Sequence, residues 1–190
     1  MQLLNRGPRV PLLRFSGPIG MATPLRPGLS SATLAGAIHK AFTMSKTPAV
    51  AIAINSPGGS PVQSSLILKQ VRQHADQHKK KVYVFCEDVA ASGGYYIACT
   101  GDTTFADKAS ITGSIGVIAG KLSIEELYSK LGINTETIKM SEFADIFSES
   151  RSLTDTEKKL FQKNIEFTYD RFTGKVMEAR NIKKDEIAGL

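Results

Sequence analysis

The stretch from Ala49 to Pro61 is the part of the sequence that most limits the possible folds. It begins with six apolar residues, AVAIAI, a continuous run that is typical of a strand buried on both faces of a sheet. Gly58 and Gly59 then predict a tight turn, and Ser60 before Pro61 suits an N-cap followed by a first helical position. A buried strand that passes directly into a helix predicts a βαβ unit with parallel strands.

The rest of the chain repeats this alternation of strands and helices. Apolar runs predict further strands, and apolar residues at helical spacing predict the helices between them. The expected strands cover residues 9–15, 49–54, 81–87, 102–106, 110–119 and 133–139; the expected helices cover 31–44, 61–80, 93–100, 123–131 and 154–180, with a last short helix from 183. Capping-box patterns open the helices at Ser123 and Thr154. We therefore expect an α/β protein with a mostly parallel sheet flanked by helices.

Composition and charge narrow the class of protein. Of 190 residues, 42% are hydrophobic and 22% are charged, which is ordinary for a globular chain and suits a single domain over residues 1–190. The net charge of +6 is scattered apart from the lysines at 79–81 and 183–184, and neither cluster has aromatic residues among its lysines. A nucleic-acid partner is therefore not expected.

The cysteines and histidines indicate no disulfide framework, metal site or cofactor. Cys86 and Cys99 form no CxxC motif and fall in apolar segments, so we expect buried free thiols. His39, His74 and His78 lie in expected helices, and the segment of the last two is polar and is expected to be exposed. No apolar run is long enough to span a membrane, so we expect no transmembrane segment and a cytoplasmic location.

A second turn of small residues lies between an apolar strand and a helix. Ser92 follows the strand at 81–87, with two alanines before it and two glycines after it. The glycines allow another backbone to approach closely, and free N–H groups at a helix start can hold a developing oxyanion. The turn suits a serine nucleophile, although a tightly packed helix start without catalysis would have the same residues.

The turns at Gly58 and Ser92 are expected at the same edge of the sheet, where the strands end and ligands bind. Their N–H groups can then converge on one oxygen, which supplies the nucleophile and the oxyanion hole of acyl transfer. A serine also needs a base. No histidine follows Ser92, and the three before it are expected on exposed helices, so the chemistry requires a buried lysine.

Three motifs resemble those of peptidase family S49, the signal peptide peptidase A and SohB-like serine peptidases. They are NSPGG at 55–59, ASGGYYIA at 91–98 and ITGSIGVI at 111–118, and the resemblance covers residues 9–180. It implies a ClpP/crotonase-like fold of repeated ββα units and hydrolysis of peptide bonds, such as those of signal peptides. It also implies peptide substrates as partners and a homo-oligomer shaped as a ring or dome.

The same resemblance implies roles for individual residues. Ser92 matches the family nucleophile, and the N–H groups of Gly93 and of the Gly58–Gly59 turn match the oxyanion hole. Ser114 matches a serine that orients a catalytic lysine. The family domain usually continues past the long helix with a segment of the type GRV(W/F)xGxxAxxxGLID, which we expect this chain to lack.

The position of the catalytic lysine is the main departure from the family. The lysine belongs to a segment of the type SGxxKD(I/M)xS, and the corresponding stretch here, MSEFADIFS at 140–148, has Ala144 in its place. Alanine cannot accept a proton. Lys139 is expected on the opposite face of a strand, and Lys121 in a surface loop, so neither is expected to replace the base.

The sequence therefore predicts a serine-type peptidase of the Ser/Lys class whose own base is missing. The alternative is a non-catalytic pseudopeptidase that binds peptides or assembles with an active paralogue. A ClpP-type protease would need a histidine after Ser92, and a crotonase-type acyl-CoA enzyme would need an acid/base carboxylate motif; neither is evident.

Overall fold

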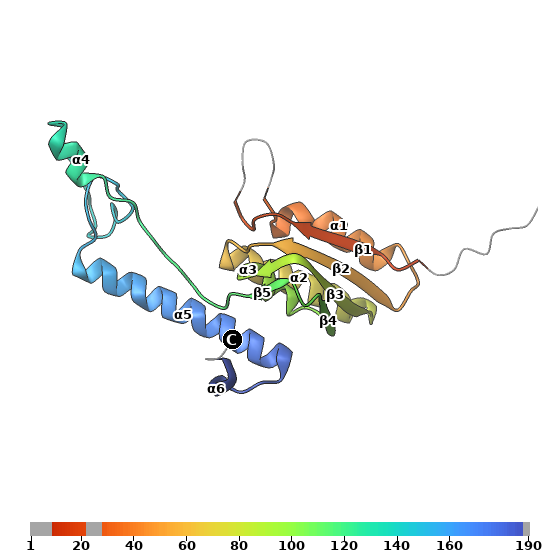
Figure 1. Ribbon diagram of the computed structural model, residues 1–190. Helices are drawn as coiled ribbons and strands as arrows, with labels where there is room; N and C mark the ends of the chain where they lie inside the picture. The colour runs from red at the N-terminus through yellow and green to blue at the C-terminus, as the bar shows by residue number, and fades with distance from the viewer. Residues whose placement is uncertain (1–8, 22–27, 188–190) are drawn as a thin grey trace, which may run out of the picture. The chain divides into compact units, whose positions relative to one another are not determined.

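The structure is a computed structural model that describes residues 9–21 and 28–187 (Figure 1). Within these residues the chain forms two compact units, which are described separately. The first unit consists of the residues up to Gly116 together with those from Arg171 onwards, and the second is Val117–Asp170. The single domain over residues 1–190 stays a prediction.

The first unit is built on a sheet in which neighbouring strands are all parallel. Four strands lie side by side in chain order, β1 (Leu12–Ser16), β2 (Ala49–Ser56), β3 (Lys81–Ala91) and β4 (Thr103–Ala106), and β5 (Ile111–Gly113) also pairs with β3. The long strand β3 has two partners because residues 83–86 pair with β4 and residues 89–91 with β5. The predicted parallel sheet is confirmed.

Three helices pack on this sheet and enclose the main core (Figure 1). They are α1 (Ser31–Thr43), α2 (Pro61–His78) and α3 (Gly93–Ala98). Helix α2 begins as predicted, because the Gln63 N–H donates to Ser60 Oγ and Pro61 is the first helical residue. Apolar side chains of the three helices are buried against those of the strands: Ile38, Phe42, Ile67, Val71 and Ile97 come from the helices, and Phe15, Ile52, Ile54 and Val84 come from the strands.

The opposite face of the sheet is only partly covered by the described residues. Phe85 on β3 is 42% exposed and Phe105 on β4 is 47% exposed, and their rings stack with centroids 5.0 Å apart. Along β2, Val50, Ile52 and Ile54 are fully buried while Ala51 between them is partly exposed. The AVAIAI run is therefore less evenly buried than a strand between two helical layers.

The end of the long helix α5 (Asp155–Arg180) packs in the first unit. Phe172 and Val176 form a second small core with Leu68 and Cys99, and the rings of Phe172 and Tyr96 meet edge to face at 5.4 Å. Arg180 Nε donates to the Tyr95 hydroxyl over 3.0 Å, with its guanidinium above the Tyr95 ring. These contacts fix α3, the helix that follows Ser92. A last short helix, α6 (Lys184–Ile187), is found where it was predicted.

The second unit contains the short helix α4 (Glu125–Lys130), an irregular segment and the first part of α5. The predicted capping box at Ser123 is wrong: no side chain caps α4, and Glu125 instead accepts the Ser152 N–H over 2.9 Å. The box at Thr154 is confirmed, because Thr154 and Glu157 exchange bonds between side chain and backbone. The strand predicted at 133–139 is absent from the described residues.

No helix in residues 9–21 and 28–187 is long and apolar enough to cross a membrane.

Candidate active site

Ser92 occupies the turn between β3 and α3 in an unusual backbone conformation. Its φ is 50° and its ψ is −121°, a region whose strain costs on the order of 1–3 kcal/mol for a residue other than glycine. Its N–H donates to the Gly113 carbonyl at the end of β5 over 2.8 Å, and its carbonyl accepts the Tyr96 N–H of α3. The partly buried Ser92 side chain thus sits on a sharp strand-to-helix turn, the backbone arrangement of a nucleophile elbow.

The turn at Gly58 and Gly59 packs directly against the Ser92 turn, as the sequence predicts. A Cβ atom on Gly58 would lie 2.7 Å from the Gly93 nitrogen and 2.8 Å from Ser92 Cβ. One on Gly59 would lie 2.1 Å from the carbonyl oxygen of Ile19, which itself accepts the Ser60 N–H. Because backbone atoms block both places, only glycine fits, and the two turns are held in contact.

The N–H groups of Gly59 and Gly93 are free to bind an oxygen. Neither donates a hydrogen bond to another described residue, and a Cβ on Gly93 would lie only 3.4 Å from the Gly59 nitrogen. The Gly58 N–H, in contrast, donates to the buried Ser56 hydroxyl over 3.2 Å. Of the two glycines predicted in this turn, Gly59 is therefore the one with an available donor.

Ser114 lies immediately beyond β5, one residue after the carbonyl that binds Ser92. Both Gly113, with φ of 85°, and Ser114, with φ of 51°, have left-handed backbone conformations, so the chain bends here and β5 ends. The strand predicted at 110–119 is therefore only three residues long. The Ser114 side chain is exposed. Ser92, the three glycines and Ser114 all belong to the first unit.

Ala144 lies in the second unit, in a turn between α4 and α5. Its side chain is exposed, and its N–H donates to the Ser141 carbonyl over 3.3 Å. The segment around it forms no helix or strand. The side chain itself is one methyl group, which offers neither a proton acceptor nor a hydrogen bond.

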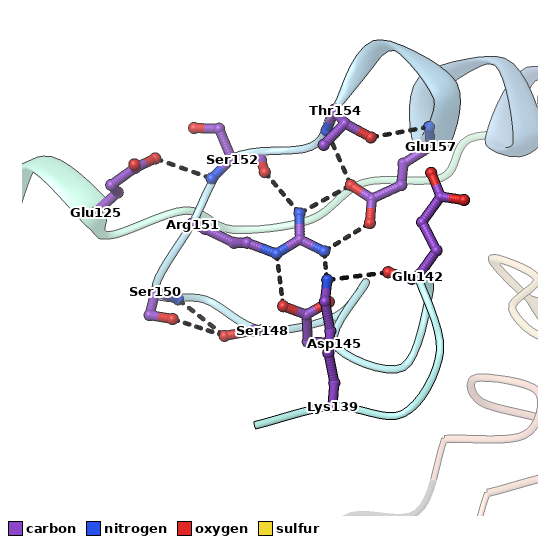
Figure 2. Close-up of polar contacts among 10 residues, drawn as sticks. All are labelled: Glu125, Lys139, Glu142, Asp145, Ser148, Ser150, Arg151, Ser152, Thr154 and Glu157. Atoms are coloured by element: carbon purple, nitrogen blue, oxygen red, sulfur yellow. Dashed lines mark hydrogen bonds and ion pairs between the residues drawn. The ribbon is translucent and has the colours of Figure 1, made fainter. Parts of the chain in front are cut away.

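A network of charged side chains holds the segment around Ala144 to the start of α5 (Figure 2). Asp145 accepts hydrogen bonds from Lys139 and Arg151 at 2.8 Å, and Arg151 also binds Glu157. The bonds from Arg151, and then those from Lys139, hold the pKa of the Asp145 carboxyl well below its usual range. Arg151 and the Thr154 N–H lower the pKa of Glu157, whose side chain is buried, to about 2.

Sequence reasoning missed this network, because Arg151 lies six residues from each of its two acidic partners. That spacing matches no regular helix or strand pattern. The only local signal was the capping box at Thr154, which places Glu157 correctly but says nothing of its arginine partner.

The surroundings of Lys139 and Lys121, the two lysines considered as substitute bases, differ from those expected from the sequence. Lys139 was placed on a strand, but no strand forms there, and its amine is paired with Asp145 and bonded to the Glu142 carbonyl. The prediction of a surface side chain is wrong for Lys121, whose Nζ is buried without a hydrogen-bond partner among the described residues.

The histidines form a cluster with Phe42 between α1 and α2. The His74 ring lies 5.7 Å from that of His39, 5.8 Å from that of Phe42 and 6.0 Å from that of His78. Burial, followed by the neighbouring His39 and His78, lowers the pKa of His74, and its Nδ1 is buried without a partner. His74 is thus less exposed than predicted. Within the described residues no group of histidine, cysteine or acidic side chains could hold a metal ion.

Both cysteines are buried free thiols, as predicted. Burial raises the pKa of the Cys86 thiol, and it raises that of Cys99 to about 11. Neither thiol is suited to nucleophilic chemistry at neutral pH.

The model of "Peptidase family S49" matches residues 74–190, which include Ser92, Ser114 and position 144. The chain belongs to peptidase family S49. This confirms the resemblance drawn from the three motifs.

Similar S49 sequences occur within much longer proteins. A chloroplastic serine protease SPPA from Arabidopsis thaliana is 36% identical over 75% of this chain and 21% of its own length. "Protease 4" from Haemophilus influenzae is 34% identical over 83% of this chain and 25% of its own length. A Brucella melitensis protein named as a Na+/H+ antiporter NhaA is 54% identical over 65% of this chain and 17% of its own length. The chain thus spans about a quarter or less of each of these relatives.

A solved structure supports the fold. A ClpP1 mutant from Listeria monocytogenes superposes with a TM-score of 0.58 over 95% of this chain and 78% of its own, at 16% sequence identity. At that identity the likeness shows the fold alone, and the predicted ClpP-like architecture is confirmed.

Proposed function

We propose that this chain is an S49 serine peptidase of the Ser/Lys class, in which Ser92 is the nucleophile and Gly59 and Gly93 form the oxyanion hole. We further propose that its activity depends on a base from elsewhere, because position 144 is alanine. The observation that carries the proposal is the contact of two turns at Ser92. A strained serine and the free N–H groups of Gly59 and Gly93 lie together there. These are the parts that acyl transfer needs apart from the base.

In the proposed reaction, Ser92 Oγ attacks the carbonyl carbon of a peptide bond. The carbonyl oxygen becomes an oxyanion, which the N–H groups of Gly59 and Gly93 bind. The hydroxyl proton passes to the base and then to the leaving amine, and water later hydrolyses the acyl-enzyme. Ser114 orients the base. Because Ala144 cannot take the proton, the isolated chain is expected to be on the order of 10⁴–10⁶ slower than a complete site.

A base from another subunit would complete the site. Several large apolar side chains in the second unit are exposed, among them Ile118, Leu122, Ile138, Met140 and Phe147. Exposed large apolar side chains often mark sites of protein interaction, which supports a homo-oligomeric ring or dome or a mixed assembly with a lysine-bearing paralogue. Peptides, including signal peptides, are the proposed substrates, and a cytoplasmic location is proposed with them.

The second candidate is a pseudopeptidase that binds peptides without cleaving them. The observation in its favour is the pairing of Lys139 with Asp145, which occupies the lysine nearest in sequence to Ala144. Under this proposal the oxyanion donors bind a peptide carbonyl, and Ser92 remains unreactive.

A fluorophosphonate probe tests the roles proposed for Ser92 and for position 144. We expect slow labelling of the natural chain, labelling at least 100-fold faster in Ala144→Lys, and none in Ser92→Ala. Ser129→Ala, a change to an exposed serine on α4, serves as the matched control and should label like the natural chain. Peptide cleavage should appear with Ala144→Lys. If that variant folds but neither labels nor cleaves faster, the assignment of position 144 is wrong.

Lys121 requires its own variant in the same assay, because its amine is buried without a partner. If Lys121 serves as the proton acceptor, Lys121→Met abolishes the slow labelling of the natural chain. If the base is absent from the chain, Lys121→Met leaves the slow rate unchanged.

A further inference from the structure

Arg151 uses its whole guanidinium group to join two acidic side chains. Its Nε and Nη2 donate to the two oxygens of Asp145, each over 2.8 Å, and its Nη1 and Nη2 donate to those of Glu157. The remaining Nη1 hydrogen is donated to the Ser152 carbonyl over 3.0 Å. All five N–H donors of the side chain are therefore used, which makes Arg151 the fixed centre of the network in Figure 2.

Asp145 directly follows position 144, and both of its oxygens are occupied. Arg151 binds each oxygen, and Lys139 shares Oδ1. A lysine introduced at position 144 would consequently meet a carboxylate whose charge Arg151 and Lys139 already balance. Without Arg151, Oδ2 of Asp145 would be open to the new amine, which would then be held in its charged form. A paired, protonated lysine cannot act as a base.

We propose that Arg151 is the positioning residue for the side chain at position 144, because it holds Asp145 against the start of α5 and keeps that position free of a carboxylate partner. This inference rests on the proposed function, in which position 144 is where an S49 peptidase carries its base. Arg151 acts through Asp145 and does not itself touch the reacting atoms.

The charged groups next to position 144 within the second unit define the controls. Lys139 and Arg151 are cations, Asp145 and Glu157 are paired with them, and Glu142 is the next nearest acid in sequence. Each variant is therefore made with and without Glu142→Gln, so that pairing of the introduced amine with Glu142 is separated from pairing with Asp145.

The test measures the introduced amine directly. Ala144→Lys is labelled with a trace of acetic anhydride between pH 6 and pH 11, and the peptide that contains position 144 is followed by mass spectrometry. We expect Arg151→Met to move the labelling midpoint up by about half a pH unit to one unit, because Asp145 then pairs with the amine. Adding Asp145→Asn should bring the midpoint back down. The proposal is overturned if Arg151→Met leaves the midpoint unchanged, or if its effect persists with Asp145→Asn.

Folding and peptide cleavage are measured separately. Circular dichroism and hydrogen exchange check the second unit; if Arg151→Met unfolds it, Arg151→Lys keeps the charge with fewer bonds and should give a smaller shift in the same direction. If Ala144→Lys cleaves peptides, adding Arg151→Met to it should lower kcat several-fold and leave KM unchanged. It should also move the acid limb of the plot of kcat against pH to higher pH. If Ala144→Lys folds but does not cleave, the assignment of the base to position 144 fails, while the labelling midpoints still decide whether Arg151 controls the pKa of the introduced amine.

Discussion

At the scale of single residues, the site is organised by backbone atoms more than by side chains. Ser92 has a positive φ, and hydrogen bonds to Gly113 and Tyr96 hold it there. Gly59 has a φ of 141° and contacts Ile19 so closely that no side chain fits. The glycines of the NSPGG motif are thus explained by two physical needs, a conformation that other residues avoid and contact between two backbones.

Gly59→Ala should therefore destabilise the first unit. The added methyl group would clash with the Ile19 backbone, so we expect a loss of about 2–4 kcal/mol in the free energy of unfolding, together with loss of Ser92 labelling. Urea denaturation measures it. The control is Gly36→Ala in α1, where no atom lies within 4 Å of the new Cβ and a gain of about 0.5–1 kcal/mol is expected. Equal effects of the two changes would contradict this account of Gly59.

At the scale of elements, the predicted strands and helices are right where they pack on the parallel sheet. The two failures have a common cause. Residues 133–139 have the composition of a strand, yet no neighbouring strand pairs with them in the second unit. Beyond Gly113, β5 likewise loses its partner, because β3 has ended at the Ser92 turn. A segment with high β-propensity forms a strand only when another strand is available to pair with it. A single sequence does not show whether such a partner is present.

The same limit applies to the candidate site. The meeting of the Gly58 and Ser92 turns follows from two parallel strands that end at one edge of a sheet. The contact of Ile19 with Gly59, and the pairing of Arg151 with Asp145 and Glu157, depend on tertiary positions with no fixed spacing. Sequence motifs could place the two turns that carry the proposed nucleophile and oxyanion donors, but could not find the residues that support these turns.

The packing of α1 on α2 should weaken in mild acid. His74 has a lowered pKa when folded, so the unfolded chain binds more protons near pH 6. This contribution to stability is complete above the unfolded value of about 6.5 and is lost as the pH falls through the lower folded value. Urea denaturation at pH 7.5 and 5.5 should show a smaller drop in His74→Leu than in the natural chain. An identical drop in both would contradict it.

At the scale of the whole molecule, α5 belongs to both units. Its residues up to Asp170 lie in the second unit, and those from Arg171 lie in the first. Phe172 and Val176 bury their side chains against Leu68 and Cys99, so the helix end is part of the support of α3.

Phe172→Ala should test that support. Removing a buried aromatic ring typically costs about 3–5 kcal/mol, and we expect the loss to appear in the first unit together with slower labelling of Ser92 in the Ala144→Lys background. Leu160→Ala on the same helix, where the side chain is exposed, should cost less than about 1 kcal/mol and leave labelling unchanged. Thermal unfolding and the fluorophosphonate rate measure the two effects. The proposed support of α3 fails if Phe172→Ala labels at the control rate.

Because both natural thiols are buried, spectroscopic labels can be attached to engineered cysteines in the natural chain. With a pKa of about 11, Cys99 has on the order of one thiolate in 10⁴ molecules at pH 7, and Cys86 is shifted in the same direction. Maleimide and methanethiosulfonate reagents should therefore not react with either thiol while the protein is folded. A spin label or fluorophore can be attached to one engineered cysteine in each unit without first removing the natural ones, and the distance between the labels can be followed as peptide is added.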